Sequence, residues 1–117
     1  MTVHEPELDE VFRNTEIVAL PGETLLRKGN ANLWRGKEAV GGRLWLTSRW
    51  LVFRSHSFNN QTGVGTWPLE EIASVAPVNT LGIVPNGMEV TLGSGERIRF
   101  VVSKRREWMT TIMQAKA

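Results

Sequence analysis

The sequence contains no cysteine and only two histidines among its 117 residues. The absence of cysteine excludes disulfides, thiolate metal sites and cysteine nucleophiles, and it fits a reducing compartment. Apolar runs are only a few residues long, which is too short for a membrane-spanning helix. The acids in the first twenty residues argue against a secretory signal. We therefore expect a cytoplasmic location.

The size of the chain and its 41% hydrophobic content are those of one ordinary globular domain. Its charges are unevenly distributed along the sequence. Residues 1–23 hold six acids and one base, whereas thirteen bases and six acids follow from residue 24 onward. We divide the chain into an acidic lead-in, residues 1–21, expected to be partly flexible, and a basic body, residues 22–117. Leu8, Val11 and Phe12 have the spacing of one short helical face, and a frayed segment is the alternative.

The body has the pattern of about seven short β-strands between turn signals. Strands are predicted over 24–28 and 33–37, as one interrupted strand or two, and then over 43–47, 50–54, 64–69, 72–78, 88–92 and 96–102. Alternation of apolar residues fixes two hairpin registers, because only one register puts the apolar side chains of both strands on one face. Leu44 is then opposite Phe53 in the first hairpin. In the second, a three-residue loop at 93–95 sets Val90 opposite Ile98.

The end of the chain changes to a helical period. After Ser103, the expected N-cap, apolar residues recur at 108, 109, 112 and 113 and predict one amphipathic helix. We expect the inward residues of strands and helix to share one core, formed by Leu44, Leu46, Leu51, Phe53, Val90, Ile98, Phe100, Val102, Trp108 and Ile112.

This order of elements is that of the pleckstrin-homology (PH) superfold, and the sequence within it resembles the GRAM domain family. The resemblance rests on Gly22–Leu26, Gly42–Phe53, Trp67–Ile72, Phe100 and the Trp108–Ile112 segment. It implies a mainly β, partly open barrel of two packed antiparallel sheets, capped by the C-terminal helix. It further implies a non-enzymatic binding module, here of a bacterial, single-domain type, that binds anionic phospholipid headgroups, a membrane surface or proteins.

The sequence offers little support for catalysis. Neither His4 nor His56 has a sequence neighbour that would make a recognisable acid–base pair, and we read His56 as an exposed loop residue. His4 lies among acidic residues in the lead-in. A solvated acidic segment is a simpler interpretation of this cluster than a metal site. We expect no enzyme activity, no metal and no cofactor.

Cations at the start of the C-terminal helix form the first candidate anion site. Lys104, Arg105 and Arg106 fall in the first turn, where the helix dipole disfavours positive charge. A phosphate bound at the helix start would reverse that penalty. The alternative is that Glu107 and solvent screen the three cations and that no ligand is bound. On the first interpretation, reversing Arg105 and Arg106 to Glu should stabilise the free helix slightly and abolish binding to anionic vesicles.

Two further pairs of cations are candidates for headgroup contacts. Arg35 and Lys37 flank the predicted bend at Gly36, and in lipid-binding members of the superfold basic residues around the first inter-strand loop contact headgroups. Arg43 and Arg54 are directly opposite in the first hairpin, where like charges repel unless a counter-anion or a carboxylate such as Glu38 neutralises them.

The outward face of the first hairpin is a candidate interaction surface. Trp45, Trp50 and Val52 point away from the predicted core, so in an isolated chain we expect them to be exposed, or buried against another subunit. The alternative function is therefore a protein-interaction or self-association module. Single-stranded nucleic acid is the least favoured partner, given the net charge of only +2. A lipid-binding protein would sit peripherally at the inner membrane surface.

Overall fold

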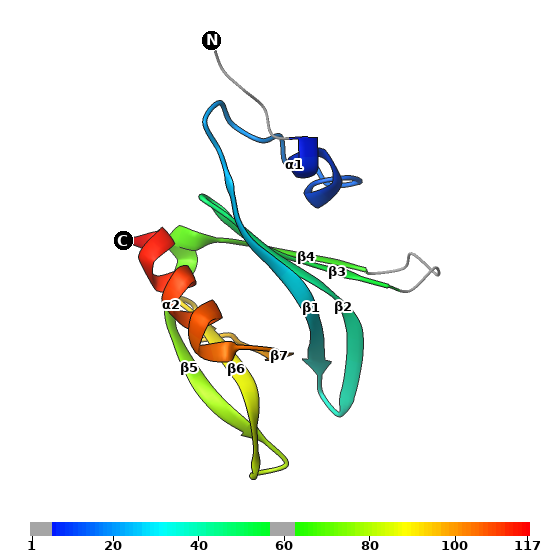
Figure 1. The fold of residues 1–117 in the computed structure, drawn as a ribbon, viewed down its shortest axis with the longest axis vertical. Helices are drawn as coiled ribbons and strands as arrows, with labels where there is room; N and C mark the ends of the chain where they lie inside the picture. The colour runs from blue at the N-terminus through cyan, green and yellow to red at the C-terminus, as the bar shows by residue number, and fades with distance from the viewer. Residues whose placement is uncertain (1–5, 57–62) are drawn as a thin grey trace.

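One curled antiparallel sheet and a C-terminal helix make up the body of the protein (Figure 1). The computed structural model describes residues 6–56 and 63–117. The elements are α1 (Pro6–Val11), β1 (Leu25–Arg35), β2 (Glu38–Thr47), β3 (Trp50–Ser55), β4 (Val64–Pro68), η1 (Leu69–Glu71), β5 (Ile72–Thr80), β6 (Val84–Leu92), β7 (Arg97–Val102) and α2 (Arg105–Lys116). The strand order is β4-β3-β2-β1-β7-β6-β5, so β4 and β5 are the sheet edges. The predicted mainly β architecture with one C-terminal helix is confirmed.

The hairpin registers follow the predicted parity. Leu44 pairs with Phe53 and Trp45 with Val52 in the β2–β3 hairpin. In the β6–β7 hairpin Val90 pairs with Ile98, across a turn that includes Gly95 at φ +96°. Most strands extend beyond their predicted bounds: β1 continues without a break, and β5 and β6 extend toward a common turn at residues 81–83. Strands β4 and β7 are each one residue shorter than predicted.

The main core fills the concave side of the sheet. All ten residues predicted to share a core are buried in this one cluster, and α2 contributes Trp108 and Ile112 to it. The guanidinium of Arg27 lies over the Trp108 ring, with its Cζ 5.1 Å from the ring centroid. Glu107, the residue before Trp108 in α2, forms a 3.4 Å ion pair with the same guanidinium. Strand β1 thus holds the helix both by packing and by charge.

A second apolar cluster lies on the opposite face of the β2–β3 hairpin. This α1 cluster consists of Leu8, Val11 and Phe12 from the lead-in with Trp45 and Val52 from the sheet. The predicted short helix is confirmed, and its apolar face covers the outward face of the hairpin. Parity assigned these side chains to the correct face, but their predicted exposure is wrong: Trp45 is 3% and Val52 0% exposed. Trp50 is half-buried beside them.

A buried carboxylate ties the end of the lead-in to the sheet. Glu23 is 3% exposed and accepts hydrogen bonds from the Thr47 hydroxyl, at 2.7 Å, and from the Leu20 backbone N–H, at 2.9 Å. The Thr47 oxygen in turn accepts the backbone N–H groups of Arg49 and Trp50. Because both partners are buried and satisfied, the segment before β1 and the β2–β3 turn are fixed relative to each other.

Candidate functional site

The predicted anion site at the start of α2 is not assembled as expected. The helix is preceded by Lys104, which has a left-handed backbone (φ 58°) and no side-chain cap, so Ser103 is not the N-cap. Arg105 is half-buried, and its Nη1 donates to the carbonyl oxygens of Val78, at 2.9 Å, and Gly87, at 3.2 Å. The same nitrogen is 3.2 Å from Asn79 Oδ1. Arg105 therefore holds α2 against the β5–β6 hairpin close to its turn, where Val78 pairs with Gly87, while Lys104 and Arg106 remain exposed.

This geometry reverses the stability expected for changes at Arg105. Replacing Arg105 with Met should lower the free energy of unfolding by about 1–3 kcal/mol, because partly buried carbonyl groups lose a charged donor. Arg106→Met changes the same charge on an exposed neighbour and should stay within about 0.5 kcal/mol of the parent. Urea denaturation of both variants measures the difference, and equal stabilities would show that the Arg105 contacts contribute nothing.

The two arginines of the β2–β3 hairpin are also engaged within the chain. Arg43 and Arg54 are directly paired, as predicted. The Arg54 Nη1 donates to the backbone carbonyls of Val11, at 3.1 Å, and Arg13, at 2.8 Å, at the end of α1. Burial of the guanidinium, together with repulsion from the Arg13 charge, lowers the pKa of Arg54. Arg43 lies over the Trp45 ring, 5.3 Å from its centroid. Carbonyl dipoles and an aromatic face thus take the place of the expected counter-anion.

A pocket of about 520 Å³ lies where the β1–β2 turn meets the β5–β6 turn, and we call it the hairpin pocket. Figure 1 shows both turns on the same side of the molecule. The pocket is lined by Trp34, Gly36, Lys37, Asn79, Thr80, Leu81, Gly82 and Arg99. Within the part of the chain that the structure describes, no hydrogen bond or ion pair engages Lys37. Arg99 is opposite Trp34 in the sheet and forms a 3.4 Å ion pair with Glu89.

Some residues at the hairpin pocket were predicted from the sequence as site residues, and others were not. Lys37 lines it and Arg35 lies beside Gly36 at the same turn, so the cations of the first loop are part of this region. Arg105 bonds Asn79, which also lines the pocket, so the start of α2 is next to it. Sequence reasoning missed Trp34, Asn79, Thr80 and Arg99, because it placed no hairpin turn between 78 and 88. The Leu81-Gly82 pair, which lies between two strand-like runs, was the sequence signal that could have indicated this turn.

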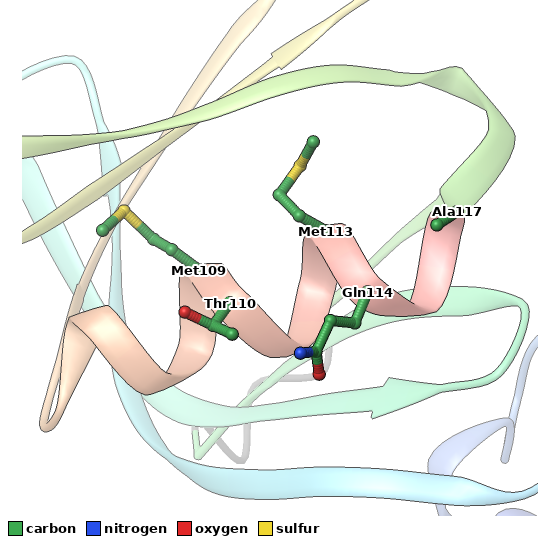
Figure 2. A pocket seen from close by; sticks show the side chains of 5 residues that line it. All are labelled: Met109, Thr110, Met113, Gln114 and Ala117. Carbon is green, nitrogen blue, oxygen red and sulfur yellow. The ribbon is translucent and has the colours of Figure 1, made fainter.

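Two other hollows on the surface have linings with no surplus of positive charge. Figure 2 shows a groove of about 470 Å³ along α2, with Met109 and Met113 on one side of the helix and Thr110 and Gln114 on the other. No charged side chain lines this groove. A hollow beside the β6–β7 turn is lined by Glu70, Glu71 and Lys116, so negative charge prevails there and would repel an anion.

Within the described residues, the side chains that commonly ligate metal ions are not gathered in one place. His56 is exposed, and His4 lies outside the described residues. Across residues 6–56 and 63–117, no group of three or more His, Cys, Asp or Glu side chains could hold a metal ion. No helix in these same ranges has the length and apolar character that crossing a membrane requires.

Similar proteins agree with this architecture. Solved structures with the same fold include the C-terminal domain of an unknown protein from Leishmania infantum, with a TM-score of 0.70, 23% identity, and coverage of 81% of this chain and 85% of that one. The Vps36 N-terminal PH domain has a TM-score of 0.64 and 17% identity, covering 81% of this chain and 80% of its own. The Slm1 PH domain has a TM-score of 0.63 and 13% identity, and the match covers 80% of this chain and 99% of that one. The fold is therefore PH-like.

The sequence comparisons identify the family within this fold. No curated protein sequence matches the chain. The family model of the GRAM domain, however, matches residues 10–116. This range contains every strand of the sheet, α2, and the end of α1 with Val11 and Phe12. Because the match extends over nearly the whole chain, the protein belongs to the GRAM domain family.

Proposed function

We propose that this protein is a non-catalytic binding module that attaches to anionic phospholipid headgroups through the hairpin pocket. GRAM and PH-like domains are typically lipid-binding or protein-binding modules, and structural work on the Slm1 PH domain describes ligand binding. The observation that carries the proposal is the position of Lys37, an exposed cation in a pocket where it has no partner among the described residues. A bacterial, single-domain type and a location at the inner membrane surface stay predictions.

The surroundings of Lys37 support an anionic ligand. Arg99 brings a second positive charge, partly balanced by Glu89. The Arg105 contact to Asn79 Oδ1 leaves the amide N–H groups of Asn79 able to donate. Lys104 and Arg106 are exposed beside Arg105, and Arg35 is exposed beside Gly36. A phosphate or carboxylate in the pocket would meet positive charge and hydrogen-bond donors together, which is the combination that holds headgroups at protein surfaces.

Reversal of the Lys37 charge should weaken membrane binding specifically. Each basic residue close to an anionic membrane contributes about 1 kcal/mol, so Lys37→Glu should reduce partitioning by about 2 kcal/mol, roughly thirty-fold. The measurement is cosedimentation with vesicles of phosphatidylcholine mixed with phosphatidylserine, compared with phosphatidylcholine alone. Binding should decrease as salt is raised, because added ions screen the attraction.

Arg49→Glu provides the matched control for Lys37→Glu. Arg49 is an exposed cation at the β2–β3 turn, which is at the other end of β2 from the β1–β2 turn, and the substitution changes the net charge equally. We expect Arg49→Glu to bind nearly as well as the parent. Equal losses for both variants would indicate a nonspecific charge effect, and an unbound parent protein would contradict the proposed function itself.

A further inference from the structure

The β5–β6 turn carries the most prominent exposed apolar side chains of the sheet. Leu81 is 87% and Ile83 78% exposed, and Val84, the first residue of β6, is 40% exposed. Isolated exposed apolar residues are common on proteins, but this group is at the tip of one hairpin. Leu81 and Gly82 also line the hairpin pocket, so the apolar tip adjoins the pocket that contains Lys37 and Arg99.

The local backbone gives no structural reason for a leucine at position 81. Leu81 has φ 54° and Gly82 φ 78°, and the Ile83 N–H donates to the Thr80 carbonyl at 3.1 Å, as in a type I′ turn. The first central position of such a turn favours Asn, Asp or Gly, because these residues tolerate the left-handed backbone. A bulky apolar residue held there against local preference, and exposed to water, is a feature expected of functional positions.

We infer that Leu81 and Ile83 insert into the acyl boundary of an anionic phospholipid bilayer while Lys37 meets the headgroups above it. This inference rests on the proposed function and specifies how the same site approaches the membrane. Apolar side chains of interfacial segments reach about 5–10 Å into the bilayer boundary, with basic residues at the phosphate level. A second copy of the chain is a poorer occupant, because a symmetric contact through this tip would bring two basic pockets together.

Removing the apolar tip tests the insertion without disturbing the fold. Leu81→Asn restores the preferred turn residue, and Ile83→Thr keeps a β-branched side chain, so the double variant should be as stable as the parent or slightly more stable. Its partitioning onto phosphatidylcholine–phosphatidylserine vesicles should decrease at least tenfold, and the loss should persist at raised salt, where the electrostatic part is screened. Stability and binding would thus change in opposite directions, which damage to the fold cannot produce.

Val18→Thr is the matched control for this variant. Val18 is 81% exposed, and it lies in the segment between α1 and β1, at the end of the molecule opposite the β5–β6 turn (Figure 1). It should bind as the parent does. If Lys37→Glu weakens binding and the tip variant does not, the proposed function stands and the insertion is overturned. If the parent binds no anionic vesicles, both are overturned.

The absence of cysteine allows a direct measurement of depth. Ile83→Cys can be labelled with an environment-sensitive fluorophore, and Ser94→Cys provides the same label on the β6–β7 turn. The nine residues of β6 separate the two turns by about 30 Å. On adding anionic vesicles, the label at 83 should shift to the blue and the label at 94 should not. No shift at 83, or equal shifts at both positions, would overturn the inference.

Self-association through the tip has a distinct signature. Sedimentation velocity without vesicles should give a monomer mass for both the parent and the Leu81→Asn, Ile83→Thr variant. A dimeric parent that becomes monomeric in the variant would show that the tip contacts another copy, and this result would overturn membrane insertion.

Discussion

Replacing Trp108 with alanine should lower the free energy of unfolding by about 3–5 kcal/mol. Trp108 is 2% exposed and, with Ile112, is one of the two α2 residues buried in the main core. Its loss leaves a cavity in the main core and removes the aromatic face beneath the Arg27 guanidinium. For a domain of this size, a change of that magnitude lowers the melting temperature by well over ten degrees.

The control for this variant is on the same helix. Met113 is 40% exposed, so Met113→Ala removes a large apolar side chain from the same helix without opening the core. Denaturant titrations followed by far-ultraviolet circular dichroism measure both variants, and Met113→Ala should stay within about 1 kcal/mol of the parent. Near-native stability of Trp108→Ala would mean that α2 does not close the sheet.

Replacing Leu8 with alanine should weaken the packing of α1 on the sheet by a free energy of about 2–5 kcal/mol. Leu8 is 1% exposed and contacts the outward face of the β2–β3 hairpin together with Val11 and Phe12. A helix of six residues has too few internal hydrogen bonds to persist alone, so α1 depends on this packing. We expect the variant to release α1 and expose Trp45, with faster amide hydrogen exchange in α1 and in the following segment.

Glu7→Ala separates the packing contribution from the charge contribution of the same helix. Glu7 pairs with Lys28 at the surface, where exposed ion pairs contribute at most about 1 kcal/mol. This variant should retain slow exchange in α1. If Leu8→Ala and Glu7→Ala have the same small effect, the α1 cluster does not hold the helix in place.

The parts of the fold that the sequence predicted are those controlled by alternation. Leu44 and Phe53 had to face inward together, and only one register of the β2–β3 hairpin allows this. Helical spacing likewise identified Trp108 and Ile112 as the buried face of α2. These constraints are local, because they depend on residues a few positions apart.

Alternation could not show what covers the second face of the sheet. Alternation correctly assigned Trp45 and Leu44 to opposite faces of the sheet. It carries no information on whether another segment packs against Trp45. The signal was the short apolar helix pattern at Leu8, Val11 and Phe12, which needed a surface to bury against. Linking the two requires contact between segments more than thirty residues apart, and a pattern within either segment does not report such a contact.

The candidate site was predicted only in part for the same reason. Lys37 was identified from its position at a turn, and it lines the hairpin pocket. Arg105 was assigned to an anion because a cation at a helix start is unfavourable alone. Its partners, the carbonyls of Val78 and Gly87, are supplied by a hairpin whose turn was not predicted. Hydrogen bonding to backbone carbonyls leaves little sequence signature, since every residue carries the same acceptor.

The position of α1 has a consequence for the order of events during synthesis. The helix is synthesised before the β2–β3 hairpin, and the surface on which it packs is incomplete until β3 ends at Ser55. The helix is too short to persist before then. We therefore expect α1 to become ordered only after the β2–β3 hairpin, although it precedes that hairpin in the chain. Until the β2–β3 hairpin forms, Leu8, Val11 and Phe12 remain available to chaperones that recognise short apolar segments flanked by charge.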